Sequence, residues 1–288
     1  MLRRRWLPDA GVLPVPVSER QLAEFASKHA GQIPFDTSPR HLAGPGDARH
    51  VTHGLAAAGW TRINEPLDTH LVLASPDHRH RLQFTPETGY VASWWQLSSV
   101  GFGSGYWQAS FGALVPAEVI SRLTDALIAP PPDEPPEPWQ TMEAAGWARA
   151  EDGTARSSDG RCVIQHRPPS EFHDAPEWSM DTHESGDTAY PGPRIWHARF
   201  HADTPAHLVN AFISALTDTS PLQRGKLDRT GHYSAVQEPS RLSPEQVVTA
   251  HTERIKAITA QDRVARRRQR LTTAPAAAHR TGTAPLRR

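Results

Sequence analysis

Short apolar segments alternate with turn residues in the first half of the chain. Segments 71–73 and 82–84 flank the tetrapeptide Ser-Pro-Asp-His at 75–78, in which the proline fixes φ and the aspartate can accept a hydrogen bond from its own backbone. This arrangement predicts a β-hairpin. Two further segments, 94–97 and 107–111, are predicted strands, because their aromatic side chains suit a half-buried pleated surface.

Residues at helical spacing frame this predicted sheet. Asp47 can cap a short helix that ends at Ala58, where Gly59 suits a left-handed backbone conformation. A second helix begins near Pro116 and carries an apolar face. One helix packed on one antiparallel sheet buries both apolar faces, so the pattern predicts an α+β unit. The apolar face comprises Val119, Ile120, Leu123 and Leu127.

The same series of elements is written twice. Trp60, at the end of an Ala-Ala-Gly-Trp segment, recurs as Trp147, at an offset of 147 − 60 = 87 residues. Collinear blocks of this kind predict a duplicated unit. The remaining landmarks pair Ser75 and Asp77 with Ser157 and Asp159, Trp95 with Trp178, segment 107–111 with 196–200, and the first helical stripe with Leu208, Val209, Phe212 and Leu216, for which Thr204 is the predicted N-cap.

These patterns divide the chain into five parts. Residues 1–40 form an N-terminal extension with a short helix, which opens on a capping box of Ser18 and Gln21. The first repeat covers 41–129 and the second 139–224, separated by a proline-rich linker at 130–138. Residues 225–288 contain a linker, a basic helix that starts near Ser243, and a tail that we expect to be disordered. The sequence leaves open whether the two sheets join, although units this small bury little surface alone.

The ordered landmarks resemble a known family. The Ala-Gly-Trp helix end, the Ser-Pro-Asp hairpin, the Trp-x-Ala-x-Phe strand and the closing amphipathic helix together resemble the bacterial SPDY-motif domain, domain of unknown function 317, which often occurs in two copies. The resemblance covers about residues 41–224 and implies no assigned activity, ligand or catalytic residue. His78 stands where the motif has tyrosine, and the second copy keeps only the serine and the aspartate.

Composition narrows the class of protein. Lys plus Arg and Asp plus Glu are equal at 31 each, so net charge favours neither a nucleic-acid binder nor an enzyme for acidic substrates. The single cysteine, Cys162, excludes an intramolecular disulfide and a cysteine-rich zinc site, and we expect it in the core. Neither a secretion signal nor an apolar stretch of membrane-spanning length is recognisable. We therefore expect a cytoplasmic protein with no membrane contact.

No catalytic, metal or cofactor site is predicted. His197 and His201 would lie about 13 Å apart along a strand, too far to share an ion. His78 and His80 flank a turn without a carboxylate or cysteine companion, so we interpret these histidines as turn and surface residues. The glycine-rich segment 101–106 leads into a strand, whereas a dinucleotide-binding loop leads into a helix.

Two features point to binding. Trp94 neighbours the repeated Trp95 and so lies on the opposite face of its strand, which makes it the predicted exposed aromatic residue. From Leu242 to the end of the sequence, ten Lys and Arg stand against three acidic residues. This segment is either a solvated basic tail or a phosphate-binding element. The candidate nucleic-acid contacts are Arg263, Arg266, Arg267, Arg268 and Arg270.

Duplication without recognisable chemistry favours a non-catalytic interaction module. We expect the repeats to bind a protein partner whose identity the sequence does not give. A nucleic-acid-associated protein that uses the basic C-terminal helix is the first alternative. A small-ligand binder or an enzyme with a cleft between the repeats is the second.

Overall fold

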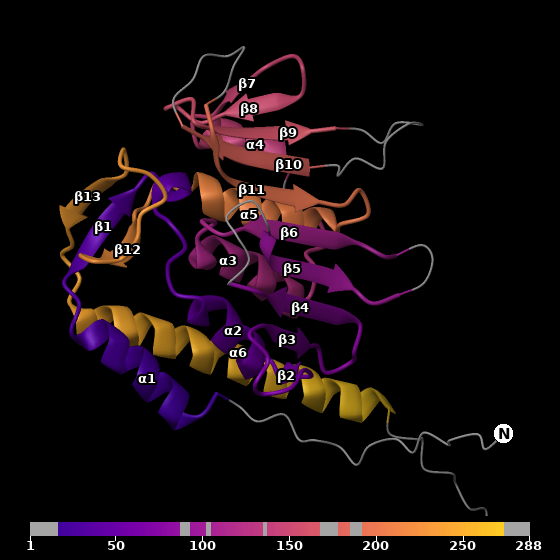
Figure 1. The fold of residues 1–288 in the computed structure, drawn as a ribbon. Coiled ribbons are helices and arrows are strands. Elements are labelled where there is room, and N and C mark those ends of the chain that lie inside the picture. The colour runs from indigo at the N-terminus through magenta and orange to yellow at the C-terminus, as the bar shows by residue number, and fades with distance from the viewer. Residues whose placement is uncertain are drawn as a thin grey trace, which may run out of the picture.

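Ten antiparallel strands from both repeats form one continuous sheet in the computed structural model (Figure 1). The structure describes residues 17–86, 93–101, 105–134, 137–167, 178–184 and 192–273, with side chains in the last helix up to Arg267. Within these residues six α-helices and a second, three-stranded sheet complete the α+β fold that the sequence predicts.

The first repeat runs from helix to strands to helix. Its closing helix carries the predicted apolar face, in which Val119, Ile120 and Leu123 are buried. The elements are α2 (Arg49–Ala57), β2 (Thr61–Arg62), β3 (Leu71–Ala74), β4 (His80–Phe84), β5 (Ser93–Ser99), β6 (Gln108–Gly112) and α3 (Ala117–Ile128).

The second repeat has the same order of elements. Cys162 is buried in its third strand, as predicted. The elements are α4 (Pro138–Ala144), β7 (Ala148–Arg149), β8 (Thr154–Arg156), β9 (Cys162–His166), β10 (Trp178–His183), β11 (Arg194–Phe200) and α5 (Ala206–Thr217).

The two repeats join through their last strands. β6 pairs antiparallel with β11, with Phe111 opposite Ala198 and Ser110 opposite Arg199. The strand order is therefore β2-β3-β4-β5-β6-β11-β10-β9-β8-β7. The two repeats join edge to edge within one sheet and run in opposite order across it. This pairing answers the question that the sequence leaves open.

The paired Ser and Asp residues build the same turn in both repeats. Ser75 donates its hydroxyl to Asp77 at 2.6 Å and accepts the N–H of His80 at 3.0 Å. In the second repeat, Ser157 makes the same two bonds, to Asp159 and from Cys162, at 2.5 and 3.0 Å. The motif therefore closes a hairpin.

The fourth residue of the turn has a left-handed backbone in both repeats. Its φ is 58° at His78 and 71° at Gly160. The position accordingly accepts glycine without strain, whereas a side chain there is tolerated at some cost.

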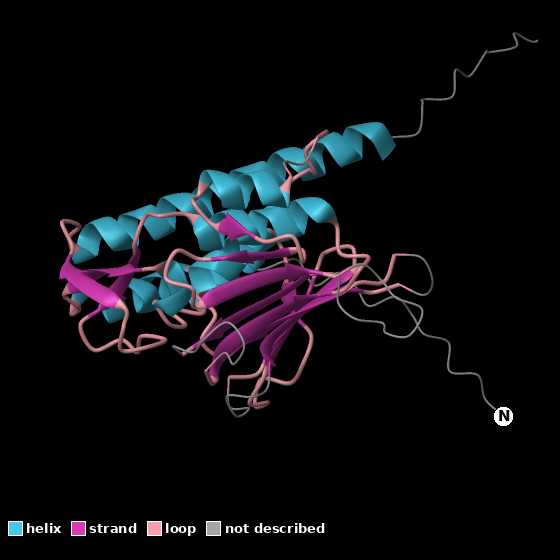
Figure 2. Ribbon diagram, turned by 90° about the horizontal axis from the view of Figure 1, so that it is seen from above, coloured by secondary structure: helices cyan, strands magenta, loops and turns pink. Residues whose placement is uncertain are grey.

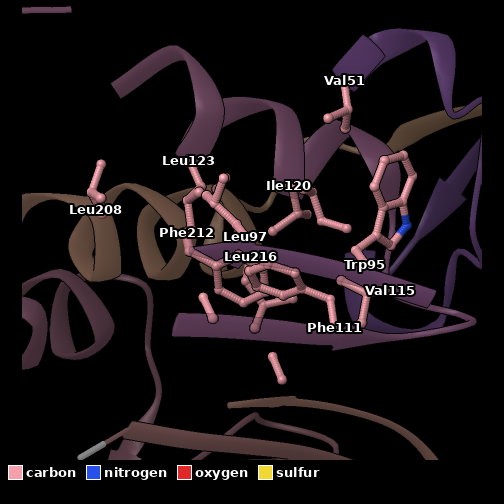
Figure 3. Packing of buried hydrophobic residues seen from close by; sticks show 14 of the residues in the cluster. Val51, Trp95, Leu97, Phe111, Val115, Ile120, Leu123, Leu208, Phe212 and Leu216 are labelled. Atoms are coloured by element: carbon pink, nitrogen blue, oxygen red, sulfur yellow. The ribbon is translucent and has the colours of Figure 1, made fainter. Parts of the chain in front are cut away.

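The helices cover one face of the large sheet (Figure 2). α3 packs against α5 at the centre, and α2 and α4 flank them. Rings and branched side chains from both repeats meet beneath this layer, where Phe111 stacks on Phe212 with ring centroids 5.2 Å apart (Figure 3). Each fully buried side chain of this kind contributes about 1.5–3 kcal/mol. All three repeated tryptophan pairs are buried, as a shared core requires: Trp60/Trp147, Trp95/Trp178 and Trp107/Trp196.

The N-terminal extension contributes a helix and a strand. α1 (Glu19–Ala30) begins with the predicted capping box, in which the Ser18 hydroxyl accepts the N–H of Gln21 and the Gln21 side chain accepts the N–H of Ser18. A one-turn 3-10 helix, η1 (Arg40–Leu42), leads from the extension into the first repeat.

The small sheet was not predicted. β1 (Pro34–Ser38) lies between β12 (Leu222–Gly225) and β13 (Val236–Pro239) and so ties the extension to the segment after the second repeat. Every residue of β13 is exposed, so its sequence lacks the apolar alternation by which a strand is recognised.

The predicted C-terminal helix is confirmed and belongs to the folded body. α6 (Pro244–Thr273) packs on α1 and α2 and buries His251, Ile255 and Ile258. Its later turns extend past the edge strand β2 (Figure 1). None of the helices in the described ranges combines the length and apolar character that crossing a membrane requires.

Three local predictions need correction. Pro205, not Thr204, is the N-cap of α5, and the buried Thr204 hydroxyl has no partner within the described residues. His197, expected at the surface, is buried on β11 because it lies over Gly112 and contacts Ser93. Asp47 accepts the N–H of Arg49, but the N-cap residue of α2 is Ala48.

Candidate functional site

A groove of about 740 Å³ crosses the helix layer between α3, α5 and α6, so residues of both repeats line it. Its walls include the start of the proline-rich linker. Small side chains predominate among its apolar residues, which leaves the helix backbones accessible to a bound segment. These apolar residues are Ala126, Ile128, Ala129, Pro130, Pro132, Ala211, Ala215, Ala257 and Ile258.

One end of the groove carries two arginines around one carboxylate. Arg40 binds Asp218 at 2.8 Å and also donates to the carbonyl oxygen of Ala215 at 2.8 Å. Burial alone would raise the pKa of Asp218, but hydrogen bonds from Ser220 and the charges of Arg40 and Arg122 hold it below its ordinary value. Arg122 is exposed and has no hydrogen-bond or ion-pair partner within the described residues. This end is therefore short of one negative charge.

Arg254 forms the wall between the groove and a second hollow. It binds both oxygens of Asp125 and donates to the carbonyl oxygen of His50 at 2.8 Å. One guanidinium thus connects α6 to α3 and α2. Removing it would weaken one of the contacts that hold the C-terminal helix against the first repeat.

The second hollow is a polar cavity of about 560 Å³ between α2, α3, α6 and the small sheet. Arg224 binds Glu118 with two nitrogens, at 2.6 and 3.1 Å, and also donates to the carbonyl oxygens of Ala43 and Gly44. Burial would raise the pKa of Glu118, but Arg224 holds it below its ordinary value. A Cβ at Gly46 would lie 2.7 Å from the carboxylate, so glycine is required there.

Histidines and one phenylalanine join α1, α2 and α6 beside this cavity. His251 stacks on Phe25 with ring centroids 3.9 Å apart, and its Nε2 lies 3.1 Å from Nδ1 of His53. Burial, reinforced by nearby positive charge, lowers the pKa of His53 to about 4 and that of His251 to about 2. Both rings are therefore neutral near pH 7, and a hydrogen bond between them is allowed.

Asp47 is surrounded by positive groups at the same junction. Arg49 and Lys28 contact its carboxylate at 2.7 and 3.0 Å, and His29 lies 3.4 Å away. Burial would raise the pKa of Asp47, but bonds from His29 and Arg49 lower it far below its ordinary value. Asp47 therefore remains charged and connects α1 to the start of α2.

A serine and a histidine meet on the opposite face of the sheet. The Ser93 hydroxyl lies 3.1 Å from Nε2 of His197. Burial and the charges of Arg194 and Arg199 lower the pKa of His197 to about 4, which makes the ring a weak base. Arg199 already holds both oxygens of Asp181, at 2.7 and 2.8 Å. The geometry therefore fits a structural contact better than an activated nucleophile.

The structure separates the predicted binding residues. Arg263 and Arg267 are exposed on α6, whereas Arg266 binds Asp262 at 2.7 Å. The side chains of Arg268 and Arg270 lie outside the described residues. Trp94, on β5, is half-buried, with its ring centroid 6.4 Å from that of Phe84.

No sequence pattern singles out the charged residues of the groove and the cavity. Glu118, Arg122 and Asp125 occupy the polar face of a predicted amphipathic helix, which any solvated helix also has. The partners of Glu118 and Asp125 are Arg224 and Arg254, which lie 106 and 129 residues away, so only the tertiary fold brings each pair together. No group of three or more His, Cys, Asp or Glu in the described ranges could hold a metal ion.

Comparison with known proteins identifies one family. Residues 74–133 and 156–222 match the SPDY model, described as a domain of unknown function (DUF317). The first match starts at the end of β3 and extends beyond α3, and the second runs from β8 to the start of β12. No curated protein and no solved structure matches the chain. Two segments of the chain therefore match the SPDY domain of unknown function, consistent with tandem copies of that domain.

Proposed function

We propose that this protein is a non-catalytic binding module and that the groove between α3, α5 and α6 holds a segment of a partner protein. The observation that carries the proposal is that residues of both repeats line the groove. α3 comes from the first repeat and α5 from the second. The pairing of β6 with β11 therefore creates a surface that neither repeat has alone. α6 then closes one side of it.

The lining favours a polypeptide. Small residues such as Ala211 and Ala257 let a helix or an extended chain approach closely, as in helix-in-groove recognition. Three arginines against two aspartates leave one positive charge, at Arg122. We therefore expect the bound segment to carry small apolar residues and one acidic side chain. A nucleic-acid backbone needs several free cationic groups, but Arg40 and Arg254 already form ion pairs with Asp218 and Asp125.

The buried cysteine supports a proposal about the cellular compartment. Cys162 is fully buried, and burial raises the pKa of its thiol, which keeps it protonated and unreactive. A lone thiol of this kind suits a reducing compartment. We place the protein in the cytoplasm of a bacterium.

Site-specific photo-crosslinking tests the groove. A photoreactive residue at Ser214, which is exposed and lines the groove, should trap one defined segment of one cellular protein. The same residue at Gln96, exposed on the open face of the sheet, is the positional control. Ala257→Trp should abolish the Ser214 crosslink by filling the groove, whereas Ala260→Trp, exposed on the same helix outside the groove, should not. Equal trapping from Ser214 and Gln96, or trapping that survives Ala257→Trp, would contradict the proposal.

Nucleic-acid binding by α6 is the second candidate, favoured by the exposure of Arg263 and Arg267 four residues apart. Removing α6 would be a poor test, because the helix contributes Ile255 and Ile258 to the core. Replacing the exposed Arg263 and Arg267 by glutamine leaves the packed face intact. Salt-sensitive binding of a DNA or RNA oligomer that disappears in this variant would support the second candidate.

A further inference from the structure

The polar cavity contains buried groups that lack partners. His251 is 4% exposed, and its Nδ1 has no hydrogen-bond partner within the described residues. The same holds for Oε1 of Gln223, and both residues line the cavity. The wall of the cavity therefore includes two residues with a buried polar atom that the protein itself does not satisfy.

The contact between His53 and His251 determines whether Nδ1 of His251 is a hydrogen-bond donor or an acceptor. A hydrogen bond between two neutral imidazoles needs one donor and one acceptor. When Nδ1 of His53 donates, Nδ1 of His251 carries a proton and is a donor; in the opposite tautomer it is an acceptor. In either tautomer Nδ1 of His251 is a buried polar atom without a partner among the described residues.

The charges around the cavity leave one cation without a partner. Arg40, Arg224 and Arg254 are paired with Asp218, Glu118 and Asp125, respectively. Asp47 is held by Arg49 and Lys28, and Asp228 accepts from the N–H of Gly225 and from Gln32. Arg122 lines the cavity without an ion pair to any described residue. A single negative charge on the ligand would complete the set.

Apolar residues form one part of the wall. Leu222 is 6% exposed, and Val247 and Ala250 face the cavity from α6. The volume of about 560 Å³ lies within the range of small-molecule sites, about 300–1,000 Å³. The cavity therefore suits a molecule with an apolar body and one anionic end.

We infer that this cavity binds a small organic acid whose carboxylate pairs with Arg122 and whose apolar body packs on Leu222 and Val247. Arginine favours this pairing because its planar guanidinium matches a carboxylate with two parallel hydrogen bonds. The site does not depend on the proposed partner, although Arg122 borders both hollows.

Calorimetric titration of the full chain, without any partner, tests the inference. The probes are benzoate, octanoate and 4-phenylbutyrate, with 4-phenylbutanamide as the uncharged analogue and inorganic phosphate as a plain anion. The variants are Arg122→Gln and, as matched control, Arg263→Gln, which makes the same change at an exposed site on α6 away from the cavity. Circular dichroism checks that both variants fold.

At least one of the three acids should bind the wild type and Arg263→Gln with one-site saturation. The same acid should bind Arg122→Gln at least tenfold more weakly. 4-Phenylbutanamide should bind the wild type, Arg263→Gln and Arg122→Gln with the same affinity. That affinity should be no higher than the affinity of 4-phenylbutyrate for Arg122→Gln. Saturation by none of the three acids, equal binding to Arg122→Gln and the wild type, or equally tight binding of phosphate would overturn the inference.

Discussion

Arg254 of α6 binds Asp125 of α3 through two contacts, Nε to Oδ2 at 2.9 Å and Nη2 to Oδ1 at 2.5 Å. The two residues are 129 positions apart, and both side chains are largely buried. Their pairing holds the C-terminal helix against the first repeat and forms the wall between the groove and the polar cavity. The segment outside the matched SPDY regions is thus built into both candidate sites.

Arg254→Leu should lower the free energy of unfolding by about 1–2 kcal/mol, because it removes charge-assisted hydrogen bonds from a partly shielded site and leaves Asp125 unpaired. Urea denaturation measures the loss, and a double-mutant cycle with Asp125→Asn isolates the pair. The exposed pair Lys256–Glu253 on the same helix is the control, for which a cycle should give about 0.5 kcal/mol or less. Equal coupling energies for the two pairs would contradict the structural role of Arg254.

Gly160→Ala should destabilise the protein by about 1–2 kcal/mol, because φ at this position is 71° and an L side chain is strained there. A Cβ at Gly160 has no neighbour within 4 Å, so the loss would come from the backbone alone. Gly31→Ala, at a negative φ and equally open, is the matched control and should be close to neutral. Thermal unfolding of the two variants compares them.

Asp159→Ala should cost about 1 kcal/mol more than Asp77→Ala, although the two residues close equivalent turns. Asp159 also binds the buried ring of His41 at 2.9 Å, whereas the Asp77 side chain is 55% exposed. Burial would raise the pKa of Asp159, but His41 lowers it, which indicates a favourable contact with the charged form. Unfolding free energies that match within error would refute this asymmetry.

Acidification should loosen α1 and α6 before the large sheet unfolds. The pKa values of His53 and His251 are depressed in the folded protein, so below about pH 6.5 the unfolded chain takes up protons that the folded chain does not. Stability is therefore present above pH 6.5 and falls towards pH 4, by about 1–3 kcal/mol between pH 7 and 5. The depressed carboxylates Asp47 and Asp159 contribute only at lower pH.

Hydrogen exchange, corrected for intrinsic rates, measures this loosening. Amides of α6 should lose more protection between pH 7 and 5 than those of α5. His251→Gln should reduce the difference, because it removes one of the two titrating rings. Uniform loss of protection across both helices would instead implicate His50, His80, His197 or His207, whose pKa values burial also lowers.

Local signals predicted the repeats because each turn, cap and apolar stripe acts over a few residues. The Ser75–Asp77 turn, Gly59 at the end of α2 and the face around Ile120 are of this kind. The small sheet was missed because its strands are short, β13 is exposed along its whole length, and β1 pairs with segments far away in the chain. Thr204 failed as a cap because Pro205 already supplies the extended conformation before α5.

The groove and the polar cavity could not be predicted from the sequence, because both depend on contacts between segments far apart in the chain. The groove depends on β6 pairing with β11, and the cavity on β12 reaching α3 through Arg224 and Glu118. Neither contact leaves a spacing pattern. The predicted arginines of α6 do reach the surface at Arg263 and Arg267, but the groove uses the preceding turns of that helix.

The affinity of the protein for the segment trapped at Ser214 tests the central proposal most directly. That segment, made as a labelled peptide, would be titrated with the wild type, Ala257→Trp and Ala260→Trp. We predict a loss of at least tenfold for Ala257→Trp, which fills the groove, and unchanged affinity for Ala260→Trp. Equal affinity of all three proteins would show that the partner binds elsewhere and would contradict the assignment of the groove.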